Sequence, residues 1–398
     1  MANRSHPRSR GLRLSSLGLT ILALLLGLTA CASDSGDEGG ELRVAAVLPL
    51  TGPAAEIGAA WKAGIELAED VINDNGGLTI DGKKVDIKVK IVDDESTPAG
   101  AQRVIQELLN EDYQLFFGPS TSANFQTAFA TLKDDERRLV ISPAQAAEPF
   151  LTEGGRLFKT NPSQSPEALA GFAQQFADYL KPQTVAILQP QDPGGDAAAQ
   201  NLAKGFEEAG VEVVYNNQVP ADTRDFLPIV SAIRNTDPDL VITPYLDSVG
   251  GPFLQQAAQV GYVDTKFASY GGSSAQVAEA PEISEFTYML PPRAPDNPDD
   301  EVVADFRAAY EEKFDHEPKP IDTYALMVYD PLLMLAQAVE DAGTSTDIAA
   351  ISTALREVTD WNGKALPFSF DEKGLIQLET MQLATLRDGV TTYTDFVP

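Results

Sequence analysis

The sequence predicts an α/β protein of two domains, each built on a doubly wound parallel sheet. Short runs of β-branched and other apolar residues alternate with amphipathic helical stretches, and this rhythm occurs in two successive blocks. Repeated βα units of this length give parallel strands with helices on both faces of the sheet. About 355 residues follow the N-terminal segment, which is enough for two domains of ordinary size.

The first block predicts alternating strands and helices. Strands are expected at residues 42–49, 85–92, 114–117 and 139–142, and helices at residues 57–75, 97–110 and 122–133. Asp81-Gly82 predicts a hairpin turn ahead of the second strand. Thr97 followed by Pro98 is typical of a helix start, with Thr97 as the N-cap.

The second block repeats the pattern and then departs from it. Strands are expected at residues 184–188, 211–215, 240–243 and 266–270, and helices at residues 196–209, 225–234, 249–260, 300–314 and 323–342. The end of the chain predicts short strands at residues 368–370, 378–384 and 391–396, with a turn at residues 371–374.

The N-terminus predicts an export signal. Residues 1–30 carry four arginines and no acid, and residues 17–28 form an apolar run. This run is shorter than the ~20 apolar residues that span a bilayer. We therefore expect a signal peptide over residues 1–30 and a flexible tether over residues 31–41, which are rich in Gly, Ser and acid.

Cys31 is the single cysteine of the chain and follows the apolar run. Leu28-Thr29-Ala30-Cys31 resembles the lipobox of bacterial lipoproteins. The resemblance implies cleavage before Cys31 and lipidation of its thiol, which would anchor the protein to the cell membrane on the extracytoplasmic face. The alternative is an ordinary signal peptide in which Cys31 stands by chance.

The mature chain is acidic and poor in the residues that most catalytic sites need. Loss of the four N-terminal arginines takes the formal net charge from −30 to −34, which argues against nucleic acid as a partner. His316 is then the one histidine left, and a lipidated Cys31 leaves no thiol. Most nucleophile–histidine pairs and zinc sites are thereby excluded, and we expect neither a metal nor a cofactor.

Two dense acidic runs are the remaining argument for an enzyme. Asp93-Asp94-Glu95 follows a strand and could hold a metal or act as an acid–base pair, but we expect a solvated loop there. Residues 134–136 end a helix and are expected to face solvent. The chain has no phosphate-binding Gly-Lys-Thr loop and no Gly-x-Gly-x-x-Gly spacing. We therefore predict that the protein is not an enzyme.

Several short motifs occur in order along the chain. They are VAAVLPLTGP at residues 44–53, INDNGG at 72–77, VDD at 92–94, FGPSTS at 117–122, VISP at 140–143, PFLT at 149–152, YALMVYD at 324–330 and FDEKG at 370–374. Together they resemble the Leu/Ile/Val-type substrate-binding proteins of ABC transporters, the branched-chain amino acid family. The resemblance covers about residues 42–396.

The resemblance implies a type I periplasmic-binding-protein Venus flytrap, in which a three-segment hinge joins two α/β lobes. The first lobe is expected at residues 42–162 and 293–372, and the second at residues 163–292 and 373–398. The three chain crossings are expected near residues 160–165, 290–295 and 370–375.

The resemblance also implies ligand contacts in the first lobe. In the family, the Ser four residues after the Gly of the Gly-Pro turn contacts the ligand carboxylate, and here that residue is Ser122. A hydroxyl and an N–H group at the start of a helix suit an anion, although Ser122 could also be only an N-cap. The second contact segment is Ala144-Gln145-Ala146, which lacks the usual Thr or Ser contact to an α-amino group.

The second lobe departs further from amino-acid binders of the family. Gly194 stands where they have a tyrosine, and Gly271 stands where they have an acid that pairs with the ligand ammonium. Asp247 could replace this acid, or it could be a solvated N-cap. Ile57, Tyr245 and Tyr270 are candidates for the walls of the site, each of which could equally belong to a core.

The expected function is capture of a small ligand for uptake. We expect an amino acid or amide derivative first, and an aromatic or other small organic acid next. Hinge closure would trap the ligand, and the closed, monomeric protein would deliver it to ABC permease subunits and their ATPases. The alternative is a ligand sensor on the same fold that reports to a membrane receptor or kinase.

Overall fold

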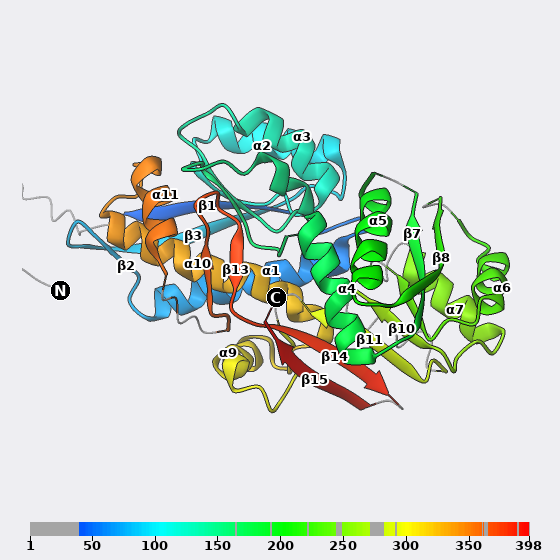
Figure 1. Cartoon of the computed structure of the whole chain (residues 1–398). Coiled ribbons are helices and arrows are strands. Elements are labelled where there is room, and N and C mark those ends of the chain that lie inside the picture. The colour runs from blue at the N-terminus through cyan, green and yellow to red at the C-terminus, as the bar shows by residue number, and fades with distance from the viewer. Residues whose placement is uncertain are drawn as a thin grey trace, which may run out of the picture. The chain divides into compact units, whose positions relative to one another are not determined.

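The computed structural model describes residues 40–397 with internal gaps at residues 164, 192, 221–222, 244–248, 271–281, 291–292, 360, 362–364 and 388–389. Two large sheets with helices packed on them make up the fold (Figure 1). This α/β architecture confirms the predicted fold class.

The first sheet has the strand order β2-β3-β1-β4-β5-β6. Its strands are β1 (Glu41–Leu48), β2 (Leu78–Ile80), β3 (Lys83–Asp93), β4 (Leu115–Phe117), β5 (Leu139–Ser142) and β6 (Leu157–Lys159). All neighbouring strands are parallel except β2 and β3. The segments between them include α1 (Ala55–Asp74), α2 (Pro98–Asn110), α3 (Ser122–Leu132) and the 3₁₀ segment η1 (Gln145–Phe150).

Local signals explain where these elements begin and end. Asp81 and Gly82 have φ angles of 49° and 76° in the turn that joins β2 to β3, the left-handed backbone that a tight hairpin favours. Thr97 Oγ1 accepts a hydrogen bond from the Gly100 N–H at 3.0 Å, and Pro98 is the first residue of α2. The predicted hairpin and helix start are both confirmed.

The second sheet has the strand order β15-β14-β11-β10-β9-β7-β8. Its strands are β7 (Thr184–Pro190), β8 (Glu212–Val219), β9 (Leu240–Thr243), β10 (Lys266–Ser269), β11 (Glu285–Leu290), β14 (Met381–Arg387) and β15 (Val390–Phe396). Strands β7 to β11 are parallel, and β14 and β15 add an antiparallel edge. Its helices include α4 (Pro166–Leu180), α5 (Pro193–Glu208), α6 (Leu227–Asn235) and α7 (Gly251–Gln259).

The late helices return to the first sheet. They are α9 (Ala304–Phe314), α10 (Thr323–Ala342) and α11 (Ile348–Glu357), preceded by the 3₁₀ turns η3 (Glu301–Val303) and η4 (Pro320–Asp322). Figure 1 shows α10 beside α1, and the two helices pack closely. A methyl group at Gly64 of α1 would lie 2.3 Å from the Ala325 carbonyl oxygen of α10. Glycine at this position therefore permits the close approach of the two helices.

The apolar cores follow the two large sheets. Buried apolar residues around the first sheet come from residues 42–158 and 303–376, and those around the second come from residues 169–294 and 381–384. Along β7, Val185 and Ile187 face one core and Ala186 and Leu188 face the other, as the alternation of a strand requires. The exact limits of the lobes remain a prediction.

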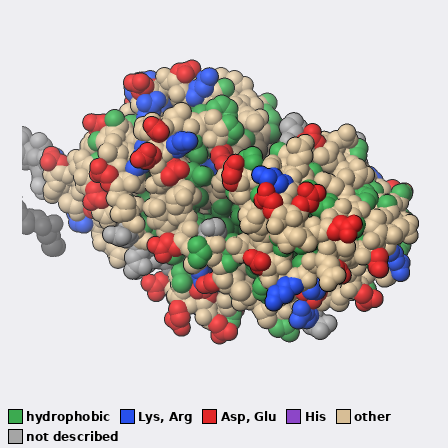
Figure 2. All heavy atoms as spheres, viewed as in Figure 1, with side chains coloured by type: hydrophobic (Ala, Val, Ile, Leu, Met, Phe, Trp, Pro, Cys, Tyr) green, Lys and Arg blue, Asp and Glu red, His purple; other side chains and the backbone are tan. Residues whose placement is uncertain are grey.

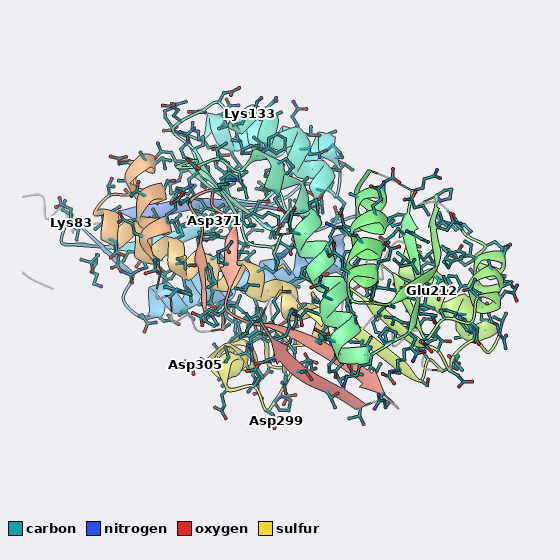
Figure 3. The ribbon with its side chains drawn as sticks, in the orientation of Figure 1. Lys83, Lys133, Glu212, Asp299, Asp305 and Asp371 are labelled. Carbon is teal, nitrogen blue, oxygen red and sulfur yellow. The ribbon has the colours of Figure 1, made fainter. Side chains whose placement is uncertain are left out.

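A third, two-stranded sheet lies near the end of the chain. It pairs β12 (Phe368–Phe370) with β13 (Ile376–Leu378), and Asp371 in the turn between them is labelled in Figure 3. Just after this turn, Leu375 pairs with Lys159 in an isolated parallel bridge. The end of β6 and the residue that precedes β13 therefore lie side by side.

The sequence prediction missed several elements. Helices α4 and α11 and strands β6 and β11 were not expected, and the strand expected at residues 378–384 is divided between β13 and β14. Both missed helices begin with a side-chain N-cap, Ser165 and Asp347, so their signal is present in the sequence. Among the described helices, none combines the length and hydrophobicity that a bilayer-spanning segment needs.

Candidate functional site

The candidate site begins at the carboxyl ends of the strands of the first sheet. Strand β1 pairs with β3 on one side and with β4 on the other, so the strand order reverses here. Ligands of open α/β sheets bind at such a switch point, beyond the carboxyl ends of the strands. The turn that leads from β4 into α3 and the segment that follows β5 both start at this edge.

Ser122 and the second predicted contact segment meet at this edge. Ser122 is the first residue of α3, after the N-cap Thr121, and its side chain is exposed. Its Oγ accepts a hydrogen bond from the Ala146 N–H at 3.2 Å. The hydroxyl therefore joins two segments instead of capping its own helix, so the reading of Ser122 as only an N-cap is wrong.

Ser142, which the sequence analysis did not single out, holds these segments in place. Its buried Oγ donates to the Pro119 carbonyl oxygen at 2.6 Å and accepts from the Ala144 N–H at 3.1 Å. One hydroxyl thus fixes the turn after β4 to the start of the segment after β5. The available signal was a serine at the last position of a buried strand.

The other predicted residues of the first lobe differ in exposure. Ala144 is buried, Gln145 and Ala146 are half-buried, and the Gln145 Oε1 atom is enclosed without a hydrogen-bond partner among the described residues. Ile57 lies in the first turns of α1 and packs, half-buried, against the core of the first sheet. The structure therefore brings Ser122 together with Ala146, and packing leaves part of the Ile57 side chain exposed.

The acidic run at the end of β3 is solvated at Glu95 but not at Asp94, for which the prediction of a solvated loop is wrong. Asp94 is fully buried, and desolvation raises its pKa in spite of the hydrogen bond that its Oδ1 accepts from the Ser96 N–H at 2.9 Å. Asp93 accepts from the Leu50 and Thr51 N–H groups at 2.9 and 3.2 Å. These carboxylates organise the loop ahead of α1. No group of potential metal ligands occurs in the described part of the chain.

In the second sheet, polar side chains end three neighbouring strands. Gln189 lies in β7, Thr243 ends β9, and Tyr270 follows β10, in the strand order β10-β9-β7. Tyr270 is buried in a core and its Oη donates to Gln189 Oε1 at 3.2 Å. The Gln189 Nε2 and Thr243 Oγ1 atoms are enclosed and have no partner among the described residues. The sequence analysis missed Gln189 and Thr243.

Several predicted positions lie outside the described residues. Tyr245, Asp247, Gly271 and Cys31 are among them. Gly194 falls in the first turn of α5. Their proposed roles remain predictions.

On the face that Figure 2 shows, charge is distributed rather than concentrated. On the face in Figure 2, acidic side chains are spread over the surface with basic side chains among them. This distribution suits solubility better than a single charged docking surface.

Comparison with known proteins identifies the family. The sequence profile of the family described as "Periplasmic binding protein" matches residues 41–390. A Leu-, Ile-, Val-, Thr- and Ala-binding protein of Pseudomonas aeruginosa is 28% identical over 341 residues, which cover 84% of this chain and 86% of the relative. A Leu/Ile/Val-binding protein homolog of Brucella suis is 27% identical over 354 residues, which cover 88% and 91%.

Solved structures share the fold. A branched-chain amino acid transporter substrate-binding protein from Streptococcus pneumoniae, in complex with isoleucine, aligns with a TM-score of 0.73 at 24% identity and covers 89% of this chain and 99% of its own. A solute-binding protein from R. palustris, in complex with benzoate, aligns with a TM-score of 0.73 at 18% identity and covers 89% and 95%. Because the profile spans most of the chain, the protein belongs to the periplasmic binding protein family, as the ordered motifs predicted, and its homologues are substrate-binding proteins rather than enzymes.

Proposed function

We propose that the protein is the extracytoplasmic solute-binding component of an ABC importer. It captures a small amino acid, amide or other organic acid between its two lobes and delivers the ligand to the permease subunits, whose ATPases drive uptake. Ligand contacts with both lobes favour the closed state over the open one, which is how a hinge protein converts binding into a shape that a partner can recognise.

The observation that carries this proposal is the set of polar groups at the carboxyl ends of both sheets. In the first sheet, the exposed Ser122 hydroxyl lies at the start of α3 and is bonded to Ala146. In the second, Gln189 Nε2 and Thr243 Oγ1 are enclosed without partners among the described residues. Buried polar atoms are rarely left without a hydrogen-bond partner. A polar ligand that reorders neighbouring side chains would supply partners for these two atoms.

A carboxylate is the ligand group that we propose for the first lobe. The start of α3 offers backbone N–H groups and the positive end of the helix dipole, and the Ser122 hydroxyl adds a donor. The ligands named for two structural relatives, isoleucine and benzoate, both carry a carboxylate. A free amino acid also needs acceptors for its ammonium group, and Asp247 is our candidate for this role.

The remaining features of the proposal concern walls and location. Tyr245, Tyr270 and Ile57 would supply apolar surface around the ligand, with Gln145 beside them. Cys31 would carry the lipid that holds the monomer at the outer face of the cell membrane. The proposed lobes, residues 42–162 with 293–372 and residues 163–292 with 373–398, would close about the three crossings.

A thermal-shift screen of the full-length protein tests the proposal. The compounds would be branched-chain amino acids, amides, short organic acids and aromatic acids. Binding to the folded state raises the melting temperature by mass action, so we expect a concentration-dependent rise with one class. A flat response to every class, from folded protein that carries no ligand, would contradict the proposal.

A further inference from the structure

Lys159 is a buried cation at the point where the chain leaves the first sheet. It is the last residue of β6 and its side chain is 0% exposed. Burial lowers the pKa of Lys159 from 10.5 to about 8, against the attraction of Glu148. A buried ammonium group is destabilising unless its donors are satisfied, so the partners of this group indicate what it holds together.

Those partners belong to separate segments. Lys159 Nζ donates to the carbonyl oxygens of Asn161 at 2.6 Å and Pro162 at 2.7 Å. It also lies 3.3 Å from Glu148 Oε2 of η1. The Lys159 N–H donates to the Gly374 carbonyl oxygen at 2.7 Å. Two of the three predicted crossings, near residues 160–165 and 370–375, thus meet at one residue.

Glu148 connects this point to the candidate ligand segment. Its Oε1 accepts a hydrogen bond from Ser163 Oγ at 2.5 Å while its Oε2 faces Lys159. Glu148 lies on the same short 3₁₀ segment as Ala146, whose N–H is bonded to Ser122 Oγ. A displacement of η1 near Ala146 would therefore also move Glu148, the acceptor of the Ser163 hydrogen bond.

The connection continues into the second sheet's first helix. Ser163 Oγ accepts from the Ser165 N–H at 2.9 Å, and Ser165 Oγ caps α4 by accepting from the Ala168 N–H at 3.2 Å. A cavity of about 310 Å³ lies beside Ser163, between α4 and residues 375–378. Specific hydrogen bonds therefore hold the crossing near residues 160–165, and a cavity borders it on one side.

We propose that Glu148, held in place by Lys159, is a positioning residue that couples the ligand segment to the chain crossings. Contact of a ligand with the Ser122–Ala146 pair fixes the position of η1. Through its hydrogen bond from Ser163, Glu148 then restricts the motion of Ser163 and of the start of α4. This role rests on the proposed function. Because coupling is reciprocal, loosening the Glu148 contacts lowers ligand affinity even though Glu148 need not touch the ligand.

Three full-length variants test this role. Glu148→Gln removes the charge that faces Lys159. Ser163→Ala keeps that charge and removes the bond between the crossing and Glu148, together with the acceptor of the Ser165 N–H. Glu111→Gln is the matched control, because Glu111 pairs with Lys90 at 2.7 Å on the exposed surface of the same lobe. Calorimetry would measure the affinity for L-leucine or benzoate, whichever binds the wild type. Hydrogen exchange would follow peptides that cover residues 144–150 and 157–163, and urea unfolding would report stability.

We expect Glu148→Gln to weaken affinity about tenfold and Ser163→Ala about fivefold, with no change in Glu111→Gln. Ligand should still slow exchange at residues 144–150 in both variants but no longer at residues 157–163. A loss of stability with unchanged affinity and unchanged protection would overturn the coupling role and leave a structural one. If the wild type binds neither probe, the compound that gives the largest shift in the thermal screen replaces them, and a flat screen counts against the proposed function, on which this role depends.

Discussion

At the residue scale, hydroxyl groups do more of the organising than the sequence indicated. Ser122 was predicted as a ligand contact, and its Oγ is bonded to the Ala146 N–H, so two predicted contact segments meet. The buried Ser142 was missed because its bond to Pro119, in the turn after β4, depends on the pairing of β4 with β5. Gln189 and Thr243 were missed for the same reason.

Replacing Ser122 should affect binding more than folding. We expect Ser122→Ala to weaken ligand affinity by ~1–3 kcal/mol, because a hydrogen bond to a charged carboxylate would be lost. Its exposed position should keep the change in unfolding free energy small. Thr127→Ala is the control variant in the same helix, because Thr127 Oγ1 bonds the Ala123 carbonyl oxygen of its own helix at 3.3 Å. Titration calorimetry should show wild-type affinity for this control. Equal affinities of the two variants would exclude Ser122 as a contact.

Lys159 makes a pH-dependent contribution to stability. Because burial lowers its pKa from 10.5 to about 8, the unfolded chain holds this proton over a range in which the folded protein has released it. The stability of the wild type relative to Lys159→Met should therefore rise between about pH 8 and 10.5, by up to about 3 kcal/mol. Urea unfolding of both proteins at several pH values measures this difference. A difference that stays constant with pH would show that Lys159 titrates normally.

At the element scale, local signals were sufficient where a cap or turn marks the boundary. The hairpin at Asp81-Gly82 and the start of α2 at Thr97 were predicted correctly. Strand β6 was not, because its short run ends in the charged Lys159 instead of an apolar residue, and its pairing with β5 is a tertiary contact. The break between β13 and β14 likewise reflects membership of different sheets, which no run of apolar residues reveals.

The space around two helical glycines predicts opposite effects of alanine substitution on stability. At Gly64 an added methyl would lie 2.3 Å from the Ala325 carbonyl oxygen, whereas at Gly171 of α4 it would meet nothing within 4 Å. Gly64→Ala should therefore destabilise by ~1–3 kcal/mol through overpacking, and Gly171→Ala should stabilise by up to ~1 kcal/mol through helix propensity. Urea unfolding of the two variants gives the signs directly. Stabilisation by Gly64→Ala would mean that the helices are not in close contact.

At the scale of the whole molecule, the fold could be predicted further than the site. Alternating βα units and ordered motifs were enough to predict the fold class, because both are spread over the whole chain. The ligand is harder to predict, because its contacts come from single side chains on segments that only tertiary structure brings together. Asp247 and Tyr245 illustrate this limit, since neither has a motif that distinguishes a ligand contact from a cap or a core residue.

Membrane attachment through Cys31 is a separate prediction at this scale. Cys31→Ser should move the protein from the membrane fraction to the soluble fraction, because serine has no thiol to which the lipid can be joined as a thioether. Fractionation of cells that express either form, followed by immunoblotting, measures the distribution. Retention of the variant on membranes in amounts equal to the wild type would contradict a lipid anchor at Cys31.

The central claim is that the protein binds a small carboxylate ligand. Titration calorimetry of the full-length protein with L-leucine, L-isoleucine and benzoate is the most direct test. The account predicts saturable binding of at least one of these compounds at one site per chain. No binding heat with these three or with any other carboxylate of the thermal screen, at several temperatures and on folded protein from which bound ligand has been removed, would contradict it.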